Sequence, residues 1–187
     1  MRVRKVVGMV GILALSSAFA SEIEDRVAAS RVAIKEFSMS LKGALKTAMA
    51  SGGPAHAIEV CKEVAPAIAA GISEDRGWDI ARTSLKLRNP SNAPDAWERG
   101  VLEQFKQRAA RGEDPQQIDH QEVVSVNGQP YFRYMKAIAT DDVCLTCHGE
   151  ELAPAIAAKL EDLYPQDQAT GFSVGDLRGA FTIRQPM

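Results

Sequence analysis

The sequence predicts an α+β domain, because helical and strand-like hydrophobic patterns occupy different parts of the chain. Apolar residues recur at steps of three and four over residues 22–50, a spacing typical of an amphipathic helix. Residues 80–88 alternate with a period of two, and Asn127-Gly128 separates two strand-like runs, as in a β-hairpin. The expected order is helix, helix, strand, helix, hairpin, helix and strand, all in one domain of residues 21–187.

The first helix is expected to be long and to end at a pair of glycines. Its apolar stripe consists of Ile23, Val27, Ser30, Ile34, Phe37, Leu41, Ala44 and Ala48. A helix over residues 22–50 would measure about 40 Å at ~1.5 Å per residue, more than a small domain needs. It therefore packs on its own domain or extends into a homodimer. Ser51-Gly52-Gly53-Pro54 should end it, with Pro54 opening the next helix.

The second helix places a cysteine on its apolar stripe. Ile58, Cys61 and Ala65 recur at helical spacing, so Cys61 should point inward. Pro66 cannot donate a backbone hydrogen bond, and we expect the helix to kink or restart there.

The elements that follow are a strand with one basic face, a helix, a hairpin, a further helix and a final strand. In residues 80–88 one face, expected to be buried, carries Thr83, Leu85 and Leu87. The opposite, basic face carries Arg82, Ser84, Lys86 and Arg88. Pro94 and Asp95 should start a helix that turns Trp97, Val101 and Phe105 to the core. Residues 152–163 should form a helix and residues 175–183 a turn and a strand.

The N-terminus has the three parts of a secretory signal peptide over residues 1–20. Cations at Arg2, Arg4 and Lys5 precede an apolar run at residues 6–15, and Ala18-Phe19-Ala20 resembles a cleavage site. The apolar run is shorter than the ~20 residues of a membrane span, and no other run approaches that length. The mature chain would start at Ser21 without a membrane span, and the periplasm is the expected location.

Cleavage would leave 19 basic and 24 acidic residues, a net charge near −5. That mild acidity argues against nucleic acid as a partner and leaves a protein redox or signalling partner open.

The segment Cys144-Leu145-Thr146-Cys147-His148 is typical of a covalent c-type haem site in an exported protein. The thiols of Cys144 and Cys147 can each join a vinyl group of one haem, and His148 is then placed to bind the iron. A C-x-x-C pair also occurs in zinc sites and thioredoxin-like proteins. Zinc would need four ligands, and the chain has no second C-x-x-C or H-x-x-x-H cluster. The sequence therefore predicts one covalently attached haem c.

Several further segments, in the same order, resemble a known family. They are Ala57 to Cys61 with Ala65-Pro66; residues 82–90 with Asn92, Pro94, Asp95, Trp97 and Glu98; Cys144 to Gly149; and Gly175 to Ala180. Over nearly the whole mature chain, the sequence resembles periplasmic c-type haem domains with a PAS-like fold, formerly a domain of unknown function and represented by a cyanobacterial haem protein. The resemblance implies a five-stranded antiparallel PAS-like sheet with flanking helices. It also implies His148 and Cys61 as the axial pair, and many such relatives are sensory domains.

The residues alone allow two interpretations of Cys61. It is the odd thiol left after haem attachment, and it could be either a ligand or a small buried apolar residue. The other candidates for the sixth iron position are Met135, His56, His120 and Met39. The basic face formed by Arg82, Lys86 and Arg88 is either solvated or a counter-charge for the haem propionates.

The identity of the second axial ligand of the haem iron decides the expected function. A thiolate should lower the reduction potential, whereas methionine opposite histidine raises it. With both axial positions filled, no site remains for a substrate, so we expect no enzyme and no catalytic residues. The expected function is redox sensing or low-potential one-electron transfer; the alternatives are a gas sensor in which CO or NO displaces the cysteine, and a His/Met electron carrier.

Overall fold

The computed structural model describes residues 11–187. Arg2, Arg4 and Lys5, together with the first half of the apolar run, lie outside the described residues, so the signal peptide stays a prediction. No helix in residues 11–187 is both long and apolar enough to cross a membrane.

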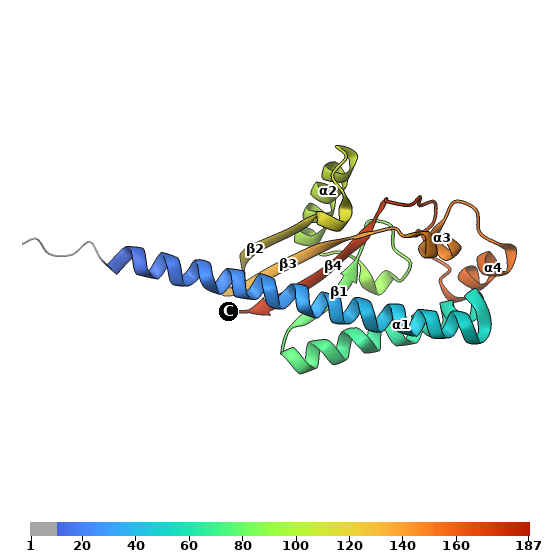
Figure 1. The fold of residues 1–187 in the computed structure, drawn as a ribbon, viewed down its shortest axis with the longest axis horizontal. Coiled ribbons are helices and arrows are strands. Elements are labelled where there is room, and N and C mark those ends of the chain that lie inside the picture. The colour runs from blue at the N-terminus through green and yellow to red at the C-terminus, as the bar shows by residue number, and fades with distance from the viewer. Residues whose placement is uncertain (1–10) are drawn as a thin grey trace, which may run out of the picture.

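The chain begins with a helical hairpin, α1 (Gly11–Arg76). Its two halves lie antiparallel (Figure 1), and Arg76 of the second half pairs with Glu36 of the first at 2.8 Å. The reversal occurs at Gly53, whose φ of 71° and ψ of −172° interrupt the helix. Such a backbone suits glycine because it has no Cβ, and the predicted end of the first helix is confirmed.

The expected kink or restart at Pro66 is wrong. Gly53 is the residue of α1 with non-helical dihedral angles, and the helix passes Pro66 without a break. Ala65 and Ile72 on either side are buried. Packing of an apolar face supplies most of the stability of a helix in a protein, so it outweighs one missing hydrogen bond.

Four antiparallel strands form one sheet in the order β1-β4-β3-β2. Their bounds are Asp79–Thr83 for β1, Asp119–Val126 for β2, Gln129–Ala139 for β3 and Leu177–Pro186 for β4. Asn127 and Gly128 join β2 to β3 with φ angles of 53° and 82°, as the Asn-Gly pair predicts. Within residues 11–187 the sheet therefore has four strands, not the five that the resemblance implies.

The strand expected at residues 80–88 is shorter than its pattern suggests. β1 ends at Thr83, and the Ser84 hydroxyl then donates to the Arg178 carbonyl at 2.8 Å and accepts the Lys86 amide at 3.1 Å. A side chain that satisfies backbone groups in this way competes with strand pairing. Arg82 therefore lies on the strand, whereas Lys86 and Arg88 lie on a loop.

Helices cover both faces of the sheet. On one face α1 buries Phe37 and Ile72 against Phe132, Tyr134 and Ile183. On the other, α2 (Ala96–Ala110) contributes a second apolar cluster. Its members are Val101, Leu102, Phe105, Ile118, Met135, Ala137 and Ala180. Asp95 and Glu98 form a capping box at the start of α2, as Pro94-Asp95 predicts.

Two short helices lie between β3 and β4 at one end of the sheet (Figure 1). They are α3 (Asp142–His148) and α4 (Pro154–Leu163). α4 packs on the second half of α1, where Ile58 contacts Ile156 and Leu160. Single 3-10 turns occur at Pro90–Asn92 and Pro115–Gln117. The Cys-rich motif therefore lies on α3, between the sheet and the turn of α1.

Candidate haem site

The helix α3 carries both motif cysteines and the motif histidine. The Asp141 amide before the helix donates to the Cys144 sulfur at 3.4 Å, and the Gly149 amide after it donates to the Leu145 carbonyl at 2.9 Å. The chain's three cysteines, Cys61, Cys144 and Cys147, are all half-buried and form no disulfide. Both motif thiols are thus available for covalent attachment.

His148 is held in one tautomer by the backbone. Its Nδ1 lies 2.6 Å from the Ala169 carbonyl oxygen, which can only accept, so Nδ1 carries the proton. Burial, together with the charges of Arg178 and Arg88, lowers the pKa of His148 to about 3. The imidazole is therefore neutral, with its lone pair on Nε2, and this is the form that binds iron.

Arg88 lies against His148 and holds the motif in place. Its Nη2 donates to the Cys147 carbonyl at 2.5 Å and to the Ala169 carbonyl at 3.2 Å. Its Nε donates to Asp167 at 3.1 Å, and its Nη1 is 3.5 Å from His148 Nε2. Asp167 also accepts the Ala169 amide at 2.8 Å, so it holds the carbonyl that orients His148. Neither the Asp167 carboxylate nor the Ala169 carbonyl has a motif of its own in the sequence.

The other two predicted basic residues differ from each other. Lys86 is exposed, with its Nζ 3.2 Å from the Thr170 carbonyl and 4.9 Å from the Phe172 ring centre. The Arg82 guanidinium lies 5.5 Å from the Phe37 ring centre, and burial lowers its pKa. Arg82 is therefore at the site's interior and Lys86 at its rim.

Arg178 on β4 is a site residue that the basic-face pattern missed. Its Nη1 donates to the Ser84 hydroxyl and the Lys86 carbonyl, each at 3.3 Å, and its Nε is buried with no hydrogen-bond partner. Burial, with the charges of Arg88 and Arg82, lowers its pKa to about 10. The sequence signal for Arg178 was its place in the Gly175 to Ala180 segment.

Cys61 approaches the motif from the second half of α1. Ile58, one helical turn earlier, belongs to the apolar cluster that Cys147 and Tyr164 pack against. Burial raises the pKa of the Cys61 thiol, and the charges of Arg82 and Arg88 partly offset this effect. Burial likewise raises the pKa of Cys147, and Cys61 contributes to that increase. Residues far apart in the sequence therefore meet at one end of the sheet.

Three of the competing ligands lie elsewhere. Met135 is completely buried in the α2 cluster, on the face of the sheet opposite α1. His120 lies on β2 with its ring centre 5.8 Å from that of Trp97. Met39 is 64% exposed on the first half of α1.

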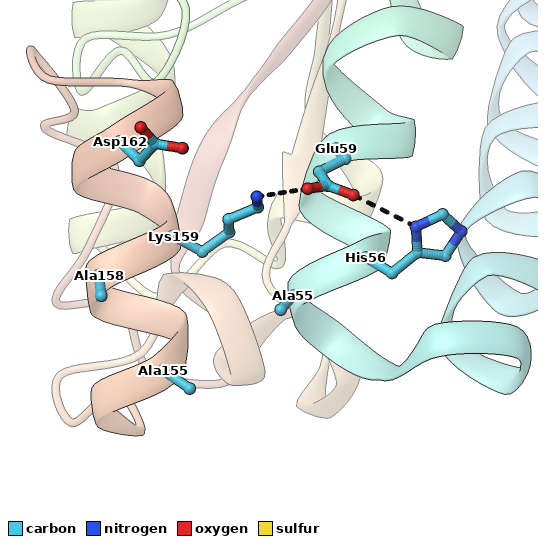
Figure 2. A pocket seen from close by; sticks show the side chains of 7 residues that line it. All are labelled: Ala55, His56, Glu59, Ala155, Ala158, Lys159 and Asp162. Atoms are coloured by element: carbon cyan, nitrogen blue, oxygen red, sulfur yellow. Dashed lines mark hydrogen bonds and ion pairs between the residues drawn. The ribbon is translucent and has the colours of Figure 1, made fainter.

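The fourth competitor, His56, lines a surface depression of about 390 Å³ between α1 and α4 (Figure 2). Its Nδ1 is 3.4 Å from Glu59, which also pairs with Lys159 of α4. Glu59, His56 and Lys159 are all partly solvent-exposed. This cluster joins two helices and lies apart from the motif thiols.

The donor set fits haem c better than a metal ion alone. Two free thiols on α3 suit thioether bonds, and His148 Nε2 suits iron. In residues 11–187 no group of three or more His, Cys, Asp or Glu side chains is arranged to hold a metal ion. The Arg88 guanidinium contacts His148 and Cys147, and the charges of Arg178 and Arg82 also lower the pKa of His148.

A comparison with known families agrees with this geometry. The model of a family described as Tll0287-like matches residues 9–186. The chain belongs to the Tll0287-like family. Among solved structures, the crystal structure of the cyanobacterial haem protein Tll0287 is similar to it, with 26% sequence identity and a TM-score of 0.66. The match covers 87% of this chain and 96% of that one. None of the curated proteins matches the chain.

Membership of the Tll0287-like family confirms the suspected family and the predicted α+β fold with its long N-terminal helix. The roles of the individual site residues stay predictions.

Proposed function

We propose that this member of the Tll0287-like family binds one haem c, with thioether bonds to Cys144 and Cys147 and with His148 and Cys61 as axial ligands. The similarity to a haem protein supports haem binding. The observation that carries the axial assignment is that Ile58, one helical turn before Cys61, belongs to the cluster that Cys147 packs against, while Met135 lies on the other face of the sheet. Haem c supplies a one-electron iron couple, and the protein sets its potential through these ligands.

The proposed role is redox sensing or low-potential one-electron transfer in the periplasm. A cysteine thiolate donates strongly to ferric iron and keeps the potential low. Two protein ligands leave no iron position for a substrate, which favours a carrier or sensor over an enzyme. The predicted net charge near −5 suits a basic protein as redox or signalling partner.

The axial assignment is tested by Cys61→Ser in the covalent holoprotein. Absorption and electron paramagnetic resonance spectra of the ferric wild type should show low-spin iron with a thiolate ligand, and the variant should lose that signature. Met135→Leu is the matched control, because it conserves a buried volume and should leave the spectra unchanged. A thiolate signature that survives in Cys61→Ser rejects Cys61 as ligand.

The covalent attachment is tested by the double variant Cys144→Ala and Cys147→Ala. After export with the haem-attachment machinery, denaturing electrophoresis with haem staining should give a stained band for the wild type and none for the variant. A stained variant would reject the thioether assignment. Fractionation of the same cells tests the periplasmic location, since a stained band confined to the cytoplasm contradicts it.

The two roles differ in what reduction does. An electron carrier keeps its ligands and reduces quickly and reversibly. A sensor loses the Cys61 bond on reduction, and CO or NO can then take that position, as in the gas-sensor alternative. Reduced spectra recorded with and without CO separate these outcomes, because CO changes the spectrum only after Cys61 has left the iron.

A further inference from the structure

We propose that Arg178 and Arg82 bind the two propionate carboxylates of the haem, and that Arg88 instead positions the motif. This inference rests on the proposed haem site and assigns the residues that recognise the cofactor's charge. It adds Arg178 to the site and removes Lys86 from it.

Arg178 lacks an anion in the protein itself. No carboxylate of residues 11–187 lies within ion-pair distance of it, and its Nε is buried with no acceptor. Its two contacts are with a hydroxyl and a carbonyl oxygen. A cation with a buried N–H group that lacks an acceptor is costly, so this arrangement favours a site completed by an anionic ligand.

Arg82 also lacks a counter-charge among the described residues. In the described part of the chain it has no ion-pair partner, and its guanidinium faces the Phe37 ring. Burial lowers the pKa of Arg82, and the nearby Cys61 partly offsets that effect. Arg178 lies 5.2 Å from the Phe172 ring centre, and that ring is 6.3 Å from the His148 ring. Arg178 therefore lies near the proposed histidine ligand, and Arg82 is a second cation without an ion-pair partner.

The charge of the site matches a dianion. The site has three guanidiniums, of Arg82, Arg88 and Arg178, and one ion-paired carboxylate. That carboxylate belongs to Asp167, which pairs with Arg88 at 3.0 Å. The two charges that remain, on Arg82 and Arg178, equal those of two ionised propionates, and arginine is well suited to carboxylates. Arg88 uses three of its five N–H groups on Asp167 and the two carbonyls, so it holds the protein rather than the ligand.

The test compares two probes that differ only in carboxylate charge. Haemin and haemin dimethyl ester are titrated into the haem-free chain with Cys144→Ala and Cys147→Ala, so that no thioether forms. This chain should bind haemin at least about tenfold more tightly than the ester. Arg178→Gln should reduce that ratio at least about threefold, and Arg82→Gln with Arg178→Gln should bring it close to one.

The control is Arg99→Gln, which removes the same charge from the exposed surface of α2 and should keep the full ratio. An unchanged ratio in Arg178→Gln overturns the carboxylate assignment while haem binding stands. The proposed haem function itself is overturned by a different result, the absence of a haem-stained band for the exported wild type. The melting temperature of haem-free Arg178→Gln supplies a second readout, because a large fall would show that Arg178 is a structural residue.

Discussion

Arg133, which is buried, and Arg178, which is half-buried, lie on neighbouring strands of the sheet and differ in their ion pairing. Arg133 on β3 forms ion pairs with Asp95 at 2.6 Å and Glu98 at 2.9 Å, and its guanidinium lies 4.2 Å from the Trp97 ring centre. Arg178 on β4 contacts no carboxylate in the described residues. The chain thus supplies carboxylates to Arg133, which anchors a helix, and supplies none to Arg178, where a haem propionate would be the counter-charge under the proposal above.

The largest loss of stability is expected for Arg133→Met in the haem-free chain. The substitution leaves Glu98 as a mostly buried carboxylate without its cation, and the free energy of unfolding should fall by about 3 kcal/mol. The equivalent Arg178→Met removes an unpaired cation, so it should leave that free energy unchanged or increase it. Equilibrium denaturation in urea measures both, and equal losses would remove the distinction between the two arginines.

The α2 region was largely predictable from sequence, because its signals are local. Pro94-Asp95 and Glu98 form a capping box, and the spacing of Val101 and Phe105 gives the buried face of the helix. Gly53 and Asn127-Gly128 were equally readable, since each needs a backbone that few other residues adopt.

The haem site was only half predictable, because it depends on contacts between distant segments. The motif predicts Cys144, Cys147 and His148 as site residues, but the Ala169 carbonyl that orients His148 has no sequence signal. Arg178 was missed because its importance comes from the carboxylates that are not beside it. Lys86 was predicted from a period-two pattern that continues past Thr83, where the strand ends, and its role at the site stays a prediction.

An intermediate loss of stability is expected for Gly179→Ala, at the residue next to Arg178. A Cβ at this position would collide with the Thr83 carbonyl oxygen and lie 3.0 Å from the Ser84 Cβ, and its φ of 157° is unfavourable for alanine. β4 would have to move away from the end of β1, at a cost of about 1–3 kcal/mol.

Gly100→Ala is the matched control in the α2 region. A Cβ there meets nothing within 4 Å, so alanine should stabilise the helix by about 0.5–1 kcal/mol. Thermal or urea denaturation of the two haem-free variants should therefore give shifts of opposite sign. A Gly179→Ala chain as stable as the wild type would show that the close approach of β4 to β1 is not required.

The smallest change in the free energy of unfolding is expected when Asp95, the partner of Arg133, is protonated at low pH. Burial alone would raise the pKa of Asp95, but the Glu98 amide and the Arg133 guanidinium outweigh it and hold the pKa below its usual value. The stabilisation is therefore present above the unfolded-state pKa of about 3.9, and it is lost as the pH falls through the lower folded-state pKa. Because the Asp95 side chain is 51% exposed, the effect should stay below about 1 kcal/mol.

Asp95→Asn isolates this titration, since asparagine is also a good N-cap and can keep the helix start intact. Urea denaturation at pH 7 and pH 3 should show the wild type more stable than the variant at pH 7, with the difference shrinking at pH 3. A difference between the two chains that is as large at pH 3 as at pH 7 would show that the Arg133 guanidinium and the Glu98 amide do not hold the pKa of Asp95 down.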